Sequence, residues 1–207
     1  MRFIRLLVIA ILAFETAVPV YWLVLHAPVG FWRRHIRMAF LVAVAGAWGI
    51  TDSLLYRFRF DLFRAHSSLW LALAGLAMIA FDVLTFSQSE GALGGMRIVG
   101  HAELAGSREL IVRGLYAHVR HPRYLGMMAG VFGACLIVAS PLLWPAILVW
   151  LALALFTIRA EERELRARLG PAYAAYAEQV PALVPLRLGR GAKRSGSPPP
   201  ARAGRES

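Results

Sequence analysis

Long apolar stretches separated by short, mostly basic segments run through most of the chain. Residues 3–25, 38–56 and 68–86 each come close to the roughly 20 residues that a helix needs to cross the hydrocarbon core of a bilayer. The first stretch is longer than the apolar part of a signal peptide, about 7–15 residues, and no clear small-residue cleavage site follows it. We therefore interpret it as a retained span, and the pattern predicts three membrane-crossing helices in this part of the chain.

A fourth apolar stretch, residues 124–158, is too long for a single span. Ser140-Pro141 lies near its middle and Pro145 follows, and proline is tolerated in the first turn of a helix but not in its interior. This stretch therefore predicts two short helices joined by a tight turn at 139–141. Together the apolar stretches predict an all-α, polytopic membrane protein with about five transmembrane helices.

The composition agrees with a membrane protein and argues against two other classes. Of the 207 residues, 58% are apolar and 17% are charged, with a mean hydropathy of +0.57, whereas a soluble domain carries about 25% charged residues. The single cysteine, Cys135, has no partner for a disulfide within the chain, which argues against a disulfide-stabilised secreted domain. A disordered chain would have a much lower hydrophobicity.

The charged residues are mostly of one sign and are unevenly distributed. The net charge is +11, and five spans place 18 of the 23 Lys and Arg residues on the side of the C-terminus. The positive-inside rule therefore predicts a multi-pass protein with its N-terminus outside and its C-terminus in the cytoplasm. Residues 187–207, which are basic and rich in Gly, Ser and Pro, predict a disordered tail. Because the basic residues collect on one membrane side, they indicate contact with membrane lipids rather than with nucleic acid.

The first unusual polar segment leads directly into the fourth apolar stretch. It contains Gly114-x-Tyr116 followed by Arg120-His121-Pro122-x-Tyr124-x-Gly126. We expect the His-Pro pair to lie at the membrane surface where a helix begins, since the unpaired N–H groups of a helix start can bind a carboxylate. The ordinary explanation is that the basic residues only anchor the chain and the tyrosines form an aromatic belt.

The second unusual polar segment continues the fifth predicted span as a helix up to Gly170-Pro171. Two of its glutamates are followed by an arginine four residues later, which predicts a solvated helix surface: Glu162–Arg166 and Glu164–Arg168. Glu161 differs, because it has no cation at helical spacing and lies at the predicted cytoplasmic boundary of the membrane. A ligand amine or ribose hydroxyl is a natural partner for it, and an ordinary interfacial glutamate is an equally good explanation.

Three further acids fall within the predicted spans: Glu15, Asp52 and Asp82. Intramembrane acids are functional candidates by default. Asp52 and Asp82 lie near span ends, where hydration gives an ordinary explanation, and the deeper Glu15 has no specific role that we can assign. The six histidines lack the spacing of a metal site, so we expect no bound metal.

These motifs resemble those of the integral membrane methyltransferases of the isoprenylcysteine carboxyl methyltransferase and phospholipid methyltransferase type. The resemblance covers about residues 100–185 and rests on residues in matching order and at matching intervals: Gly114-Leu-Tyr116, Arg120-His121-Pro122-Arg-Tyr124-Leu-Gly126, Glu161-Glu162-x-x-Leu165, Gly170-x-x-Tyr173-x-x-Tyr176 and Val180-Pro181. Together with the apolar stretches and the composition of the tail, it suggests three regions: three transmembrane helices at 1–86, a methyltransferase core at 87–186, and the tail at 187–207. The core would comprise a cytoplasmic segment, the helical hairpin 124–158 and C-terminal helices.

The resemblance implies S-adenosylmethionine as cofactor, bound in a cytoplasmic C-terminal region that opens to the bilayer for a small lipophilic or lipid-linked acceptor. In the isoprenylcysteine branch the cofactor contacts fall on residues that match Leu110, Ile111, Tyr116, His121, Pro122, Tyr124 and Glu161. An amine or phenol acceptor must lose a proton, and His121 or Glu161 is then the catalytic candidate. A carboxylate or thiolate acceptor needs no base.

The same branch places a substrate-binding arginine one helical turn before the matching glutamate, and here that position is Thr157. The nearest cation is Arg159, so Arg159 and Arg120 are the substrate candidates. The acceptor stays open among carboxylate, thiol, amine and phosphoethanolamine types, and the most similar activity is that of protein-S-isoprenylcysteine O-methyltransferases. Two alternatives are an NADPH-dependent membrane reductase related to sterol reductases and a non-catalytic membrane protein on the same scaffold.

Overall fold

The computed structural model describes residues 67–93, 110–141 and 143–184, together with scattered residues between positions 8 and 57. Five elements lie in the continuous ranges: α4 (Leu69–Leu93), the 3-10 helix η1 (Gly114–Ala117), α7 (Pro122–Val138), α8 (Leu143–Leu169) and α9 (Pro171–Gln179). None of the described residues lies in a strand, which agrees with the predicted all-α class.

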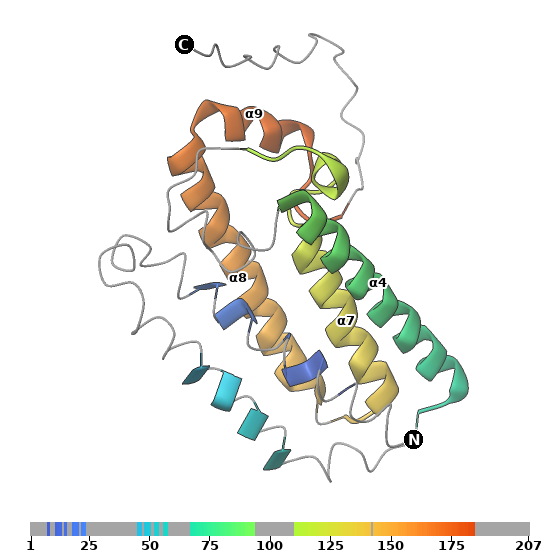
Figure 1. Ribbon diagram of the computed structural model, residues 1–207. Coiled ribbons are helices and arrows are strands. Elements are labelled where there is room, and N and C mark those ends of the chain that lie inside the picture. The colour runs from blue at the N-terminus through green and yellow to red at the C-terminus, as the bar shows by residue number, and fades with distance from the viewer. Residues whose placement is uncertain are drawn as a thin grey trace.

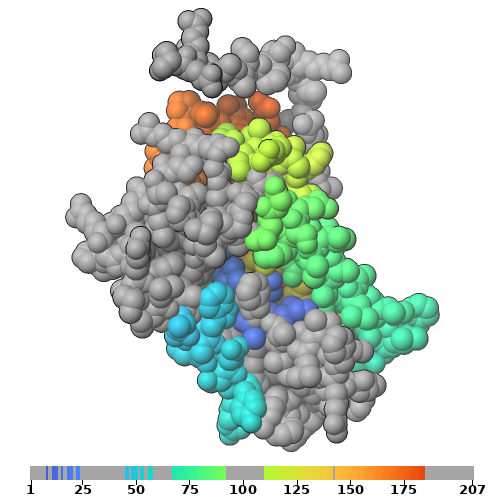
Figure 2. All heavy atoms as spheres, in the orientation of Figure 1, coloured from blue at the N-terminus to red at the C-terminus, as the bar shows by residue number. Residues whose placement is uncertain are grey.

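Helix α4 corresponds to the third predicted span. Its residues Leu69–Gly91 are apolar and long enough to cross a membrane, and most of this segment faces outward. Trp70 is 78% exposed, as expected of a side chain that faces lipid rather than a protein core. Figure 2 shows α4 at the surface of the molecule.

Two helices, α7 and α8, occupy the stretch for which the sequence predicts a hairpin, and the turn between them lies at the expected place. Ala139 ends α7 in the left-handed conformation (φ 53°), and its N–H donates to the carbonyl oxygen of Cys135 at 2.7 Å. Pro145 falls in the first turn of α8, where its missing N–H costs no helical hydrogen bond. Among the described residues, α4 and α8 are long and apolar enough to cross a membrane, whereas α7 has 17 residues.

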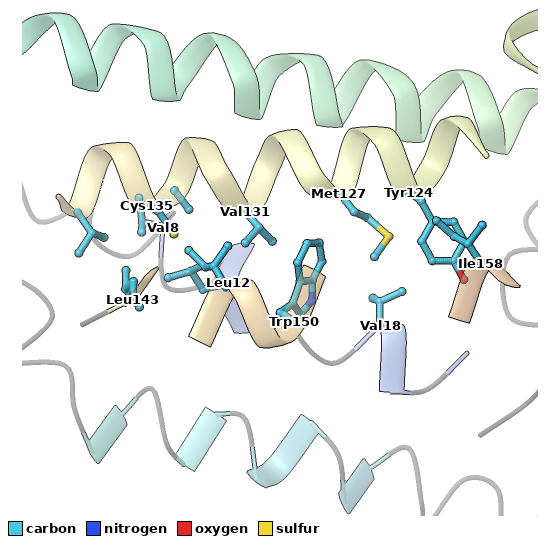
Figure 3. Packing of buried hydrophobic residues seen from close by; sticks show 13 residues of the cluster. Val8, Leu12, Val18, Tyr124, Met127, Val131, Cys135, Leu143, Trp150 and Ile158 are labelled. Atoms are coloured by element: carbon cyan, nitrogen blue, oxygen red, sulfur yellow. The ribbon is translucent and has the colours of Figure 1, made fainter. Parts of the chain in front are cut away.

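The predicted spans at 3–25 and 38–56 lie largely outside the described residues. The total of five transmembrane helices and the orientation of the termini therefore stay predictions. The described N-terminal residues nevertheless contribute to the core: Val8 and Leu12 pack with side chains of α7 and α8 such as Val131 and Trp150 (Figure 3). The indole N–H of Trp150 also donates to the backbone oxygen of Glu15 at 3.1 Å.

Helices α4 and α7 pack closely along their length because α7 presents glycines to α4. A Cβ placed on Gly133 would lie 2.5 Å from the carbonyl oxygen of Gly75, and one on Gly126 or Gly130 would collide with a side chain of α4. Small residues at such a contact let the two backbones approach each other, as is common between helices in membranes.

The polar elements gather at one end of this bundle. The first turn of α7, the last turns of α8, η1 and α9 lie together there, and the α7–α8 turn lies at the opposite end (Figure 1). Gly170 (φ 59°) ends α8 in a conformation that favours glycine, and Pro171 then begins α9 across that end.

Candidate functional site

His121 precedes the first turn of α7 and is buried between two glutamates of α8. Its Nε2 lies 3.3 Å from Oε1 of Glu162, and its Nδ1 lies 3.7 Å from Oε2 of Glu161. The ring of Tyr124 packs edge-on against the imidazole, with 5.8 Å between the ring centroids. Whichever ring nitrogen carries the proton therefore faces a carboxylate, and the imidazole is fixed in one orientation.

The side chain of Arg120 connects α8 with the end of α9. Its Nε donates to Oε1 of Glu162 at 2.9 Å, and one terminal nitrogen donates to the carbonyl oxygens of Ala177 at 2.7 Å and Val180 at 2.6 Å. Glu162 lies beyond the apolar part of α8, and its hydrogen bonds with His121 and then Arg120 lower its pKa to about 2. Glu162 is therefore a fixed negative charge that holds both basic residues.

The residues after α9 pair with the backbone that precedes α7. The N–H of Arg120 donates to the carbonyl oxygen of Pro181 at 2.8 Å, and the N–H of His121 donates to that of Ala182 at 2.9 Å. The Val-Pro pair noted in the sequence thus belongs to a short segment that closes over the start of α7. This pairing, and the hydrogen bond from the Arg120 side chain to Val180, bring the segment before α7 into direct contact with residues that lie about 60 positions later in the sequence.

Three tyrosines line the same end of the molecule. The hydroxyl of Tyr176 donates to the backbone oxygen of Tyr116 at 2.6 Å, and its ring lies edge-on to Tyr173 with 5.9 Å between centroids. Burial raises the pKa of Tyr116 and Tyr173 well above the usual range and that of Tyr176 to about 12, so all three are neutral. Tyr173 is 2% exposed, and among the described residues its hydroxyl has no hydrogen-bond partner.

The structure brings together most of the residues singled out as cofactor contacts. Tyr116, His121, Tyr124 and Glu161 converge where η1, α7 and α8 meet, and the carboxylate of Glu161 also influences the pKa of Tyr116. Pro122 begins α7 and is buried. The two remaining predicted contacts, Leu110 and Ile111, lie just before η1 and are half-buried.

The two substrate candidates lie in different places. Arg120 is held by Glu162 and two backbone carbonyls, as described above, whereas Arg159 is exposed on α8. Thr157, at the position where the resemblance to the isoprenylcysteine branch leads one to expect a substrate-binding arginine, is fully buried, and its hydroxyl donates toward the carbonyl oxygens of Leu153 and Pro19. That position therefore serves helix packing in this chain.

Two interpretations drawn from the sequence are corrected by the structure. Glu162 is not simply a solvated residue paired with Arg166, because its side chain is only 17% exposed and Arg166 is 3.6 Å away, farther than Arg120. Asp82 is not a hydrated residue at a span end, because it is buried and forms an ion pair with Arg123 at 2.7 Å. In both cases the partner comes from a distant part of the chain.

Arg123 forms a buried triad with two acids from other parts of the bundle. Besides Asp82 on α4, it contacts Oε1 of the buried Glu15 at 2.6 Å, and its guanidinium lies over the ring of Phe86 at 4.8 Å. The only sequence signal for this triad was the presence of Glu15 and Asp82 within predicted spans. From the sequence, the ordinary explanation of Arg123 is that it anchors the chain at the membrane surface, like the other basic residues of its segment.

The apolar helices and the polar site at one end of the bundle define a helical membrane protein with an enclosed cluster of titratable groups. Residues 70–171, from α4 to the first residue of α9, match the family model described as phospholipid methyltransferase. This match confirms the resemblance of the motifs to that family of membrane methyltransferases. No curated protein and no solved structure gives a match.

Proposed function

We propose that the protein is an S-adenosylmethionine-dependent methyltransferase that acts on a small lipophilic or lipid-linked acceptor. The observation that carries the proposal is the convergence of His121, Glu161 and Tyr116 at the polar end of a bundle that matches a methyltransferase family model. The polytopic topology with a cytoplasmic C-terminus is part of the same proposal. Neither the described helices nor the family match supports the reductase alternative.

The residues at this end of the bundle fit the cofactor. The side chain of Glu161 is 21% exposed, so its carboxylate can accept hydrogen bonds from a ribose hydroxyl or an amine while it faces His121. The buried hydroxyl of Tyr173 offers a further hydrogen-bonding group. The half-buried Leu110 and Ile111 supply apolar surface. When bound, S-adenosylmethionine supplies a methyl group on a sulfonium, and the protein has chiefly to align the acceptor and exclude water.

The burial of Thr157 bears on the acceptor. In the isoprenylcysteine branch an arginine at this position binds the substrate, whereas here a buried hydroxyl bonds to backbone oxygens. The closest described cation on α8, Arg159, lies two residues further on and hence on the other side of the helix. We therefore propose an acceptor bound without a carboxylate–arginine pair at this position. If it is an amine or phenol, His121 or Glu161 is placed to take its proton.

Cofactor binding is tested by titration calorimetry on the detergent-purified full chain. We expect S-adenosylmethionine to bind the wild type, and Glu161→Gln and His121→Ala to weaken binding by about 10- to 100-fold, the usual size of a lost hydrogen bond to a charged group. Glu178→Gln, an exposed residue on α9, is the matched control and should bind as the wild type does. Binding that is absent in the wild type, or unchanged in both site variants, would refute the proposal.

Tyr173→Phe separates a role in binding from a role in folding. The change removes only a hydroxyl that has no described hydrogen-bond partner, so the unfolding midpoint should stay within about 2 °C of wild type. Weaker cofactor binding at unchanged stability would assign the hydroxyl to the ligand, and unchanged binding would remove Tyr173 from the site.

The acceptor is identified by methyl transfer from radiolabelled cofactor to a panel of lipophilic compounds. The panel should contain a prenylcysteine, a phosphatidylethanolamine, a thiol and a quinol, which represent the chemistries that the site leaves open. Transfer that is abolished by Glu161→Gln and unaffected by Glu178→Gln would identify the substrate class. A wild type that binds the cofactor and methylates none of these classes would favour the non-catalytic alternative.

A further inference from the structure

The outward face of α8 changes from apolar to basic at a single residue. One row of exposed residues runs along this face at intervals of four and three: Leu148, Ala152, Leu155, Arg159, Arg163 and Arg166. Such intervals place all of them within a narrow arc of the helix surface. The three arginines therefore continue the surface that faces outward in the apolar part of the helix.

The glutamates in the same turns point elsewhere. Glu161 and Glu162 face His121, and Glu164 pairs with Arg168 at 2.8 Å. Among the described residues no acidic side chain pairs with either of the first two arginines of the row. The third, Arg166, is 58% exposed, and its one described ion-pair partner is the carboxylate of Glu162 at 3.6 Å. The row thus has a positive charge that the described part of the chain leaves uncompensated.

The position of the row along α8 places it at the edge of the hydrocarbon. The apolar part of the helix, residues 143–158, is about 24 Å long, somewhat shorter than the hydrocarbon core of about 30 Å. Arg159 therefore lies at the depth where phospholipid headgroups begin, and the long arginine side chains can extend toward them. The guanidinium group matches phosphate in geometry and charge.

We propose that Arg159, Arg163 and Arg166 form a binding site for the phosphate of an anionic phospholipid headgroup. The charge of the row and its continuity with the apolar lipid-facing surface favour a lipid over a soluble anion. This site lies on the other side of α8 from Glu161 and does not depend on the proposed methyl transfer. It would hold the polar end of α8 at a fixed depth in the membrane.

The test is native mass spectrometry of the detergent-purified chain titrated with phosphatidylglycerol or phosphatidylcholine. We expect the wild type to bind phosphatidylglycerol more tightly, and Arg159→Gln/Arg163→Gln to weaken it by about 25-fold, or about fivefold per arginine, the equivalent of about 1 kcal/mol each near an anionic membrane surface. Phosphatidylcholine binding should not change. Arg113→Gln, which removes an exposed arginine outside the row, should behave as the wild type does.

Three outcomes would overturn the proposal. One is equal affinity of the double variant and the wild type for phosphatidylglycerol, and another is an equal loss in the Arg113→Gln control. The third is displacement of the lipid by millimolar inorganic phosphate, which would assign the row to a soluble anion. Equal unfolding midpoints of the variants and the wild type ensure that a loss of binding is not a loss of folding.

Discussion

The contact between α4 and α7 gives the sharpest test of the packing. A Cβ on Gly75 would lie 2.5 Å from the carbonyl oxygen of Gly133 and 2.7 Å from Cγ1 of Ile137, whereas ordinary van der Waals contact begins at 3.4 Å. The first of these atoms belongs to the α7 backbone and cannot rotate away. Gly75→Ala therefore requires the two helices to separate by about 1 Å, and a gap of that size loses roughly a quarter to a half of each dispersion contact along the interface.

Gly91 provides a matched control on the same helix, because a Cβ there meets no atom within 4 Å. Replacing glycine by alanine inside a helix raises the free energy of unfolding by about 0.5–1 kcal/mol, and this contribution is the same for both substitutions. Gly91→Ala should therefore stabilise the protein slightly. Gly75→Ala should in addition lose about 1–3 kcal/mol from overpacking, so the difference between the two variants isolates the packing contribution.

The assay is reversible unfolding of both variants and the wild type in mixed micelles with increasing denaturing detergent. We expect the free energies of unfolding to rank Gly91→Ala above wild type and Gly75→Ala below it. If the two variants are equally stable, α4 and α7 do not pack through Gly75 and Gly133, and the reasoning about their close approach is wrong.

Two further predictions concern charged groups. Arg123→Ala should lower the free energy of unfolding by about 3–5 kcal/mol, because it leaves the carboxylates of Glu15 and Asp82 buried without their cation; full wild-type stability would contradict the triad. The second follows from the lowered pKa of Glu162, about 2 against an ordinary 4.5, which results mainly from its hydrogen bond with His121. The ionised Glu162 should stabilise the folded protein fully above about pH 4.5, and this contribution should disappear as the pH falls toward 2. The unfolding midpoints of wild type and Glu162→Gln should therefore converge in acid, and a difference that stays constant with pH would contradict this.

The hairpin could be predicted from the sequence because its determinants are local. An apolar stretch too long for one span, interrupted by Ser140-Pro141, leaves few alternatives to two helices and a turn. The start of α7 at Pro122 and the end of α8 before Gly170-Pro171 follow from equally local signals. Local backbone preferences thus determined this part of the fold.

The site could be predicted only in part. Spacing on one helix drew attention to Glu161 because it lacked a local cation, and the structure places it beside His121. The same spacing argument paired Glu162 with Arg166, whereas its closer partner is Arg120, 42 residues away in sequence. A helical interval reports which side chains are neighbours on the helix surface, and it carries no information about the element that packs against that surface.

The Arg123 triad shows why the N-terminal part of the chain matters to the site. Arg123 lies in the first turn of α7, two residues after His121, and its partners are 108 and 41 residues away in sequence. A charge pair inside a membrane is costly to break, so Glu15 and Asp82 restrict the position of the turn that presents His121. The motifs that resemble those of methyltransferases all lie after residue 100, yet the helix turn that follows their central histidine is held by two acids that precede them in the sequence. Glu15→Gln should therefore weaken the proposed binding of S-adenosylmethionine in the calorimetric titration, although Glu15 belongs to none of the motifs, and an unchanged affinity would contradict this reasoning.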